Sequence, residues 1–238
     1  MKQGLTHIIF VVDRSGSMSG IAKDMIGGYN EFIKKQKEIP GECEVFFYQF
    51  DDIYESVFEN LSLQNVPELT DKTYIPRNCT ALFDAVGKTI NNIGKKLSDM
   101  SEDERPERIL VITLTDGQNN ASKEFDGAAV RDMIKHQTEV YKWDFVFLGS
   151  NIDAWEAGGS IGVKSSSTLQ FANNSGSVAG AFRSLNANAR VYRCSAAKSA
   201  YEFQDSDYAV QASFIDNDIL KAKTLAAQAN AKKSTKTK

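Results

Sequence analysis

Apolar segments of two kinds alternate along this chain of 238 residues, and the alternation restricts the fold more than any other feature. Short continuous apolar runs are typical of strands that are covered on both faces, whereas apolar residues at helical spacing indicate amphipathic helices. The runs lie at residues 8–12, 109–114 and 145–148, and the helical spacing at 21–33, 82–97, 130–141 and 178–193. Strands that alternate with helices predict an α/β fold, with a doubly wound, mostly parallel central sheet and helices on both faces.

One strand of this sheet is expected to run the other way. Residues 43–50 are rich in Val, Phe and Tyr and predict a strand. Asp51-Asp52 then predicts a tight turn into residues 53–58, so the sheet gains one antiparallel edge strand. A short helix at 154–157 and a weak strand at 168–171 complete the predicted series.

The pattern weakens near residue 200, which divides the chain into a predicted domain, 1–200, and a C-terminal extension, 201–238. Residues 219–238 hold six lysines and no acid, with Ala, Ser, Thr and Gln filling most of the rest. We expect a frayed helix that runs into a partly disordered basic tail. Such a tail serves either to keep the protein soluble or as an electrostatic arm for a partner.

Composition excludes several classes of function. The net charge of −3 gives no basic surface for nucleic acid, and no apolar stretch reaches the length of a membrane span. Three widely spaced cysteines without a CxxC or Cys/His cluster predict neither a zinc site nor a disulfide framework. We therefore expect a cytoplasmic protein with no nucleic-acid or membrane partner.

Polar residues gather where predicted strands end or a helix begins. Asp13, Ser15 and Ser17 follow the first apolar run, and Thr115-Asp116-Gly117 follows the run at 109–114. Thr80 stands just before the helix at 82–97. In an open α/β sheet, groups at these places meet at one edge, beyond the carboxyl ends of the strands. Carboxylates and hydroxyls are hard oxygen ligands, so Asp13, Ser15, Ser17, Thr80 and Asp116 predict a site for a small divalent cation.

A structural explanation exists for each of these residues taken singly. Asp13 and Ser15 could cap the helix that follows them, Thr80 could cap the next, and Asp116-Gly117 could form an ordinary turn.

The sequence gives less support to an enzymatic function. It holds no phosphate loop, dinucleotide fingerprint or nucleophile elbow, and its two histidines, His7 and His136, fall in a predicted strand and helix.

Taken together, the three segments resemble the metal-ion-dependent adhesion site (MIDAS) of von Willebrand factor type A (vWA) domains. Asp13, Ser15 and Ser17 match the first motif of that family, Thr80 its lone threonine, and Asp116 its final aspartate. The resemblance covers about residues 5–200 and extends most to stand-alone bacterial or phage members of the family. It implies a Rossmann-like vWA fold and a bound Mg²⁺ (or Mn²⁺).

The resemblance also implies a role for the ion. Ser15, Ser17 and Thr80 would be direct hydroxyl ligands, and Asp13 and Asp116 would bind directly or through water. An Asp or Glu of a protein partner would complete the coordination, so the chain would be a non-enzymatic adaptor or scaffold. Two alternatives remain open: a self-assembling protein that uses the site between its own subunits, and a metal-dependent hydrolase or phosphatase.

One segment departs from the family pattern. The family often places small residues, frequently glycine, before the threonine, whereas Arg77-Asn78-Cys79 precede Thr80 here. Arg77 would either border the site and favour an acidic ligand or only solvate the loop. Cys79 would be either a reactive thiol or a small packed residue.

Overall fold

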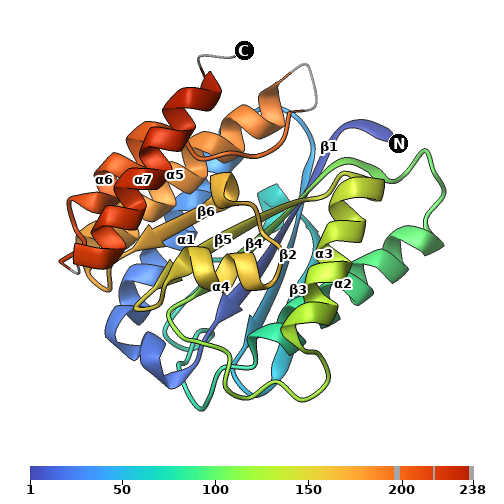
Figure 1. Ribbon diagram of the computed structural model, residues 1–238. Coiled ribbons are helices and arrows are strands. Elements are labelled where there is room, and N and C mark those ends of the chain that lie inside the picture. The colour runs from blue at the N-terminus through green and yellow to red at the C-terminus, as the bar shows by residue number, and fades with distance from the viewer. Residues whose placement is uncertain (196–198, 217, 236–238) are drawn as a thin grey trace.

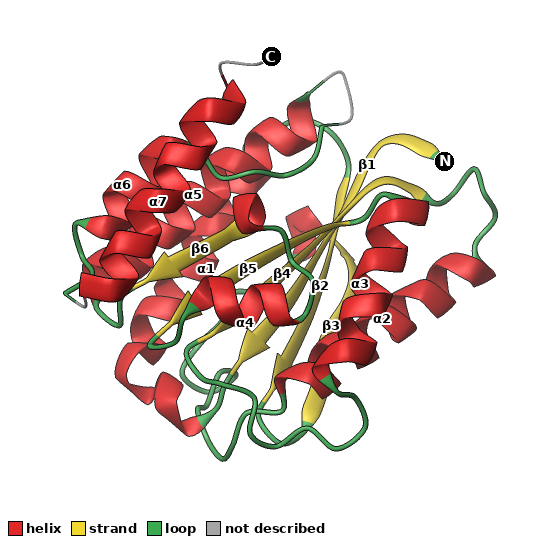
Figure 2. Cartoon of the chain, in the orientation of Figure 1, coloured by secondary structure: helices red, strands yellow, loops and turns green. Residues whose placement is uncertain are grey.

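The computed structural model describes residues 1–195, 199–216 and 218–235, and a single six-stranded sheet forms its centre (Figures 1 and 2). The strands stand in the order β3-β2-β1-β4-β5-β6, and only β3 runs antiparallel to its neighbour. Their bounds are β1 (Lys2–Asp13), β2 (Cys43–Phe50), β3 (Tyr54–Ser62), β4 (Pro106–Thr115), β5 (Asp144–Ser150) and β6 (Thr168–Phe171). The predicted α/β sheet with one antiparallel edge strand is confirmed.

Helices cover both faces of the sheet, as the alternating pattern predicted (Figure 1). Their bounds are α1 (Ala22–Lys37), α2 (Leu82–Asp99), α3 (Gly127–Tyr141), α4 (Ala154–Ser160), α5 (Ser175–Cys194), α6 (Asp205–Ala212) and α7 (Asp218–Thr235). Three short 3₁₀ turns accompany them: η1 (Gly16–Ile21), η2 (Leu63–Asn65) and η3 (Ser165–Ser167).

Two apolar clusters fill the space between sheet and helices, one on each face. The first joins one set of strand residues to α1, α5 and α6, and the second joins the alternate residues to α2, α3 and α4. Along β1, Ile8, Phe10 and Val12 face the first cluster, whereas Ile9 and Val11 face the second. Strands buried on both faces are therefore apolar throughout, which is why they were recognisable in the sequence.

The C-terminal extension continues this architecture. Tyr201, Phe203 and Tyr208 belong to the first cluster, and α7 packs against α6. The predicted helix in the extension is confirmed over 218–235, while residues 236–238 of the predicted basic tail lie outside the described residues. The division of the chain at residue 200 stays a prediction. None of the helices in the described ranges combines the length and apolar character that crossing a membrane requires.

The two ends of the strands differ in character. The carboxyl ends of the parallel strands form the lower edge of the sheet in Figure 1, where loops gather. β1 begins at the opposite edge, and α7 ends on that upper side in the same view.

Candidate metal centre

Parallel pairing brings the first and third polar segments together. β1 and β4 are neighbours, with Val12 paired to Leu114, so Asp13 ends its strand beside Thr115 and just before Asp116. Thr80 lies two residues before α2, whose first turn approaches the same edge. The structure thus brings together segments that are up to 103 residues apart in the sequence.

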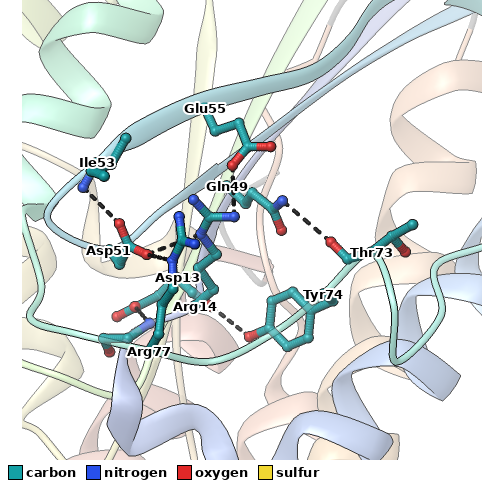
Figure 3. A network of polar contacts seen from close by, with 10 residues as sticks. Asp13, Arg14, Gln49, Asp51, Ile53, Glu55, Thr73, Tyr74 and Arg77 are labelled. Atoms are coloured by element: carbon teal, nitrogen blue, oxygen red, sulfur yellow. Dashed lines mark hydrogen bonds and ion pairs between the residues drawn. The ribbon is translucent and has the colours of Figure 1, made fainter.

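Asp13 is fully buried, and both of its carboxylate oxygens accept hydrogen bonds. The backbone N–H of Ser15 donates to Oδ1 at 2.6 Å, and the Thr115 hydroxyl donates to Oδ2. Behind it, the hydroxyl of Tyr74 donates to the Asp13 carbonyl at 2.5 Å (Figure 3). Asp13 is therefore fixed at the end of its strand by two bonds to its carboxylate and one to its carbonyl.

Ser15, Ser17 and Asp116 form a chain of oxygen atoms. The Ser17 hydroxyl donates to Asp116 Oδ1 at 2.6 Å and lies 3.0 Å from the Ser15 hydroxyl. Either of the two serine hydroxyls can donate in the second contact. Ser15 and Asp116 are buried, whereas Ser17 is exposed, so the chain of oxygens runs from the interior to solvent.

Thr80 lies near this group of oxygen atoms, next to Gly117. A Cβ atom at Gly117 would lie 3.0 Å from Thr80 Oγ1 and 3.7 Å from Ser17 Oγ, so both hydroxyls face the same small space. Asn120 holds Thr80 there: its side-chain oxygen accepts from the Thr80 N–H at 2.8 Å, and its own N–H donates to the Thr80 carbonyl at 2.9 Å. All five predicted site residues therefore belong to one cluster, whose metal-binding role the geometry alone leaves as a prediction.

Both carboxylates of the cluster are held in surroundings that oppose their charge. Burial raises the pKa of Asp13 to about 6, although hydrogen bonds from Thr115 and Ser15 act in the other direction. Burial also raises the pKa of Asp116, with partial compensation from the Ser17 hydroxyl. The nearby charge of Asp116 raises the pKa of Asp13 further. A cation bound between the two carboxylates would stabilise their ionised forms and so lower both pKa values.

The capping explanation accounts for less than the sequence suggested. Ser15 occupies the N-cap position of η1, but its side chain makes no capping hydrogen bond. The N-cap of α2 is Ala81, and the first-turn N–H groups of Phe83 and Asp84 donate to the side chains of Asn119 and Ser122 rather than to Thr80. The hydroxyls of Ser15 and Thr80 are thus not used by helix termini, and they remain turned toward the cluster.

A buried ion network supports the cluster from the β2–β3 turn (Figure 3). Asp51 is fully buried, and its carboxylate lies 3.2 Å from Arg14 Nε and 2.7 Å from Arg77 Nε. Burial by itself raises the pKa of Asp51, but Arg77, the Ile53 N–H and Arg14 outweigh it and hold that pKa below its usual value. Arg14 also pairs with Glu55 at 2.7 Å. Arg77 is thus tied to the turn, with its side chain 46% exposed.

Asp84, in the first turn of α2, is a second buried aspartate that supports the cluster. Its carboxylate accepts the backbone N–H groups of residues 123–125, each at 2.9 Å. Burial raises the pKa of Asp84, but these three bonds outweigh it and leave that pKa lowered. The loop that carries Asp116, Gly117 and Asn120 is thereby attached to the first turn of α2. Sequence reasoning missed the contacts of Asp84, Asn120 and Tyr74, which no pattern in the sequence marks, and it named Thr115 only as part of the segment that contains Asp116.

The arrangement fits a small divalent cation. Asp116 Oδ2 is buried and has no hydrogen-bond partner within the described part of the chain, and the other oxygen of the same carboxylate accepts from the Ser17 hydroxyl. Within that same part, no cluster of three or more His, Cys, Asp or Glu side chains that could hold a metal is found. The predicted ligand set, with two carboxylates and three hydroxyls, is of a different kind. Carboxylate and hydroxyl oxygens suit Mg²⁺ or Mn²⁺ rather than a soft metal.

Comparison with known proteins shows the fold alone. No family model and no curated protein matches the chain. Among solved structures, a pilus adhesin, SpaC from Lactobacillus rhamnosus GG, gives a TM-score of 0.60 at 14% identity, covering 80% of this chain and 30% of the adhesin. Proximal thread matrix protein 1 from the mussel byssus, with a zinc-occupied MIDAS motif, gives 0.55 at 17% identity, with 79% and 46% covered.

A von Willebrand factor type A structure from Catenulispora acidiphila gives a TM-score of 0.52 at 12% identity, with 78% of this chain and 42% of that chain covered. The chain thus has the vWA fold and spans less than half the length of each of these three structures.

Proposed function

We propose that this chain is a divalent-metal-dependent protein-binding module whose metal is held by Asp13, Ser15, Ser17, Thr80 and Asp116. The observation that carries the proposal is the buried oxygen Oδ2 of Asp116, which lacks a hydrogen-bond partner among the described residues while the other oxygen of the carboxylate accepts from Ser17. A buried carboxylate oxygen without a partner is costly. A cation at this position gives it one.

The residues of the proposed site have different roles. Asp13 and Asp116 supply two negative charges that balance those of a divalent ion, and the neutral hydroxyls add no further charge, so the ion keeps its ability to accept another oxygen ligand. When bound, the ion attracts a further carboxylate. Thr115, Tyr74 and Asn120 hold the ligands in place through the contacts described above. The site opens to solvent at Ser17, where a partner's Asp or Glu has access.

The fold supports a protein partner. The solved structures of the same fold include a pilus adhesin and a thread matrix protein. We propose that the chain, like a module of that kind, binds through contact rather than through catalysis. Of its two histidines, His7 is buried within β1, 2.8 Å from Glu44, six positions before Asp13, and His136 lies on α3.

Metal binding is tested by thermal unfolding. At a Mg²⁺ or Mn²⁺ concentration about 100-fold above Kd, the native state gains about 2.7 kcal/mol, which corresponds to a rise in Tm of about 5–10 °C for a chain of this size. Asp116→Ala should abolish this rise and still fold. Asp52→Ala, which changes an exposed aspartate on the same edge, is the matched control and should keep it. No rise in the wild type at millimolar metal would contradict the site.

Partner chemistry is tested with an array of peptides in which each Asp or Glu has an Asn or Gln counterpart. We expect the wild type to bind acidic peptides in Mg²⁺, to lose them in EDTA, and to ignore the amide counterparts. Size-exclusion chromatography with and without EDTA tests the self-assembling alternative. Turnover of p-nitrophenyl phosphate that Asp13→Ala abolishes would instead favour a hydrolase.

A further inference from the structure

Two more buried polar atoms lie near the same edge of the sheet, on the connection from β5 to α4. Ser150 ends β5 and is fully buried, and its hydroxyl has no hydrogen-bond partner in the described ranges. The indole Nε1 of Trp155, in the first turn of α4, is also buried and, over the same ranges, unpartnered. Neither residue belongs to the ligand set proposed above.

The strand register places Ser150 beside Asp116. β4 and β5 are parallel neighbours in which Leu114 pairs with Leu148 and Thr115 with Gly149. The next residue of β5 is Ser150, and Asp116 is the first residue after β4. Residues at equivalent positions of adjacent strands are close neighbours, so the two side chains start from adjoining backbone positions.

Both side chains belong to the same face of the sheet. Leu148 faces the cluster that contains α1 and α5, and Ser150, two residues further along β5, points the same way. The hydrogen bond of Asp116 with Ser17, which precedes α1, agrees with this direction. Trp155 packs against that cluster too. Three buried polar atoms without partners among the described residues therefore lie at one end of two adjoining strands.

Resting on the metal site proposed above, we propose that Ser150 is a positioning residue for Asp116. The Ser150 hydroxyl and the Trp155 indole hold one buried water molecule, and this water donates to one lone pair of Asp116 Oδ2, which leaves the other lone pair for the cation. A buried water typically makes about three hydrogen bonds, and these atoms supply an indole donor, a hydroxyl and a carboxylate acceptor. The water orients the Asp116 carboxylate toward the cation, as outer-shell partners do at other metal sites.

The proposal predicts an unusual pair of effects for Ser150→Ala. Mg²⁺ affinity, measured by titration calorimetry, should fall about 10- to 100-fold, the range found for outer-shell partners. The Tm of the metal-free protein should change much less than that of the Ser177 variant below, because the Ser150 hydroxyl bonds only to the water and to none of the described residues. Trp155→Phe, which removes only the indole N–H, should lower the affinity by a smaller factor.

Ser177→Ala is the matched control. Ser177 is equally buried, but its hydroxyl donates to Gln211 at 2.5 Å and accepts from the Ala172 N–H at 2.7 Å. This variant should lower the metal-free Tm and leave Mg²⁺ affinity unchanged, which is the reverse pattern.

The outcomes separate this inference from the proposed function. If the wild type binds Mg²⁺ and Ser150→Ala binds it equally well, the positioning role is overturned and the metal site stands. If Ser150→Ala behaves like the Ser177 variant, the hydroxyl is structural and the role is again overturned. Should Ser150→Ala fail to fold, Ser150→Thr keeps a hydroxyl and should retain wild-type affinity; a loss as large as that expected for alanine would overturn the role. If the wild type binds no Mg²⁺, the proposed function itself fails.

Discussion

Two pairs of buried aspartates stand along one edge of the sheet, and they are stabilised in opposite ways. Asp51 and Asp84 are surrounded by donors: two arginines and an N–H for the first, three backbone N–H groups for the second. Their pKa values are lowered. Asp13 and Asp116 face hydroxyls and each other, and their pKa values are raised.

The difference separates carboxylates that hold the scaffold from the two carboxylates of the candidate metal centre. Asp51 joins the β2–β3 turn to the Asp13 loop, and Asp84 joins the Asp116 loop to α2. Each is fully compensated inside the protein. Asp13 and Asp116 are positioned by these anchors but keep uncompensated charge, which is the property that a cation site requires.

The largest effect is expected for Asp51→Ala. This change leaves the guanidinium of Arg14, which is 4% exposed, without one of its two carboxylate partners, and it releases Arg77 and the Ile53 N–H. We expect the free energy of unfolding to fall by about 3 kcal/mol in urea denaturation. The neighbouring exposed residue gives the contrast: Asp52→Ala should change it by less than about 0.5 kcal/mol. Equal losses of stability in Asp51→Ala and Asp52→Ala would contradict the scaffold role of Asp51.

A smaller effect is expected from pH, with a sign set by Asp13. Because its pKa in the folded protein is raised from 3.8 to about 6, the folded state binds this proton more tightly than the unfolded state. In metal-free protein this group contributes stability that is present below pH 4 and is lost as the pH rises through 6. Between pH 7 and pH 5 its contribution grows by about 1 kcal/mol.

Saturating Mg²⁺ should reverse this trend, because the ion requires the ionised carboxylate. Urea denaturation at pH 5 and pH 7, with and without Mg²⁺, measures how the free energy of unfolding changes with pH in each case. Asp13→Asn is the control, because it lacks the titrating carboxyl group. If this variant shows the same pH dependence as the wild type without metal, other groups cause that dependence.

The smallest effect is expected for Arg77→Ala. The side chain of Arg77 is 46% exposed, so its 2.7 Å contact with Asp51 is screened by solvent. We expect a loss of less than about 1 kcal/mol and an unchanged response of Tm to Mg²⁺. A loss as large as that of Asp51→Ala would show that Arg77 rather than Arg14 compensates this carboxylate.

The sequence predicted those parts of the molecule that periodicity or position encodes. Strands such as 8–12 and 109–114 are apolar on both faces, so the sheet was recognisable, and Asp13 and Asp116 stood out as the first charges after them. The separation of scaffold from ligand carboxylates could not be predicted in this way. Asp51 looked like an exposed turn residue, and only tertiary contacts with Arg14 and Arg77 bury and neutralise it.

The contacts around Thr80 were hidden for the same reason. Asn120 lies 40 residues away in a loop without periodicity, and nothing local marks its side chain as the partner of the Thr80 N–H. Ser150 followed a predicted strand, but its position beside Asp116 depends on the register between β4 and β5, which the sequence does not specify.

The placement of the two described chain ends has a practical consequence. β1 begins at the edge opposite the loops of the candidate metal centre, and α7 ends on that far side as well (Figure 1). A biotin tag or surface linker attached near residue 2 would therefore leave the ligand-bearing loops pointing away from the support. Immobilised in this orientation, the protein could be washed alternately with Mg²⁺ and EDTA, and captured molecules would be released without denaturing the bait.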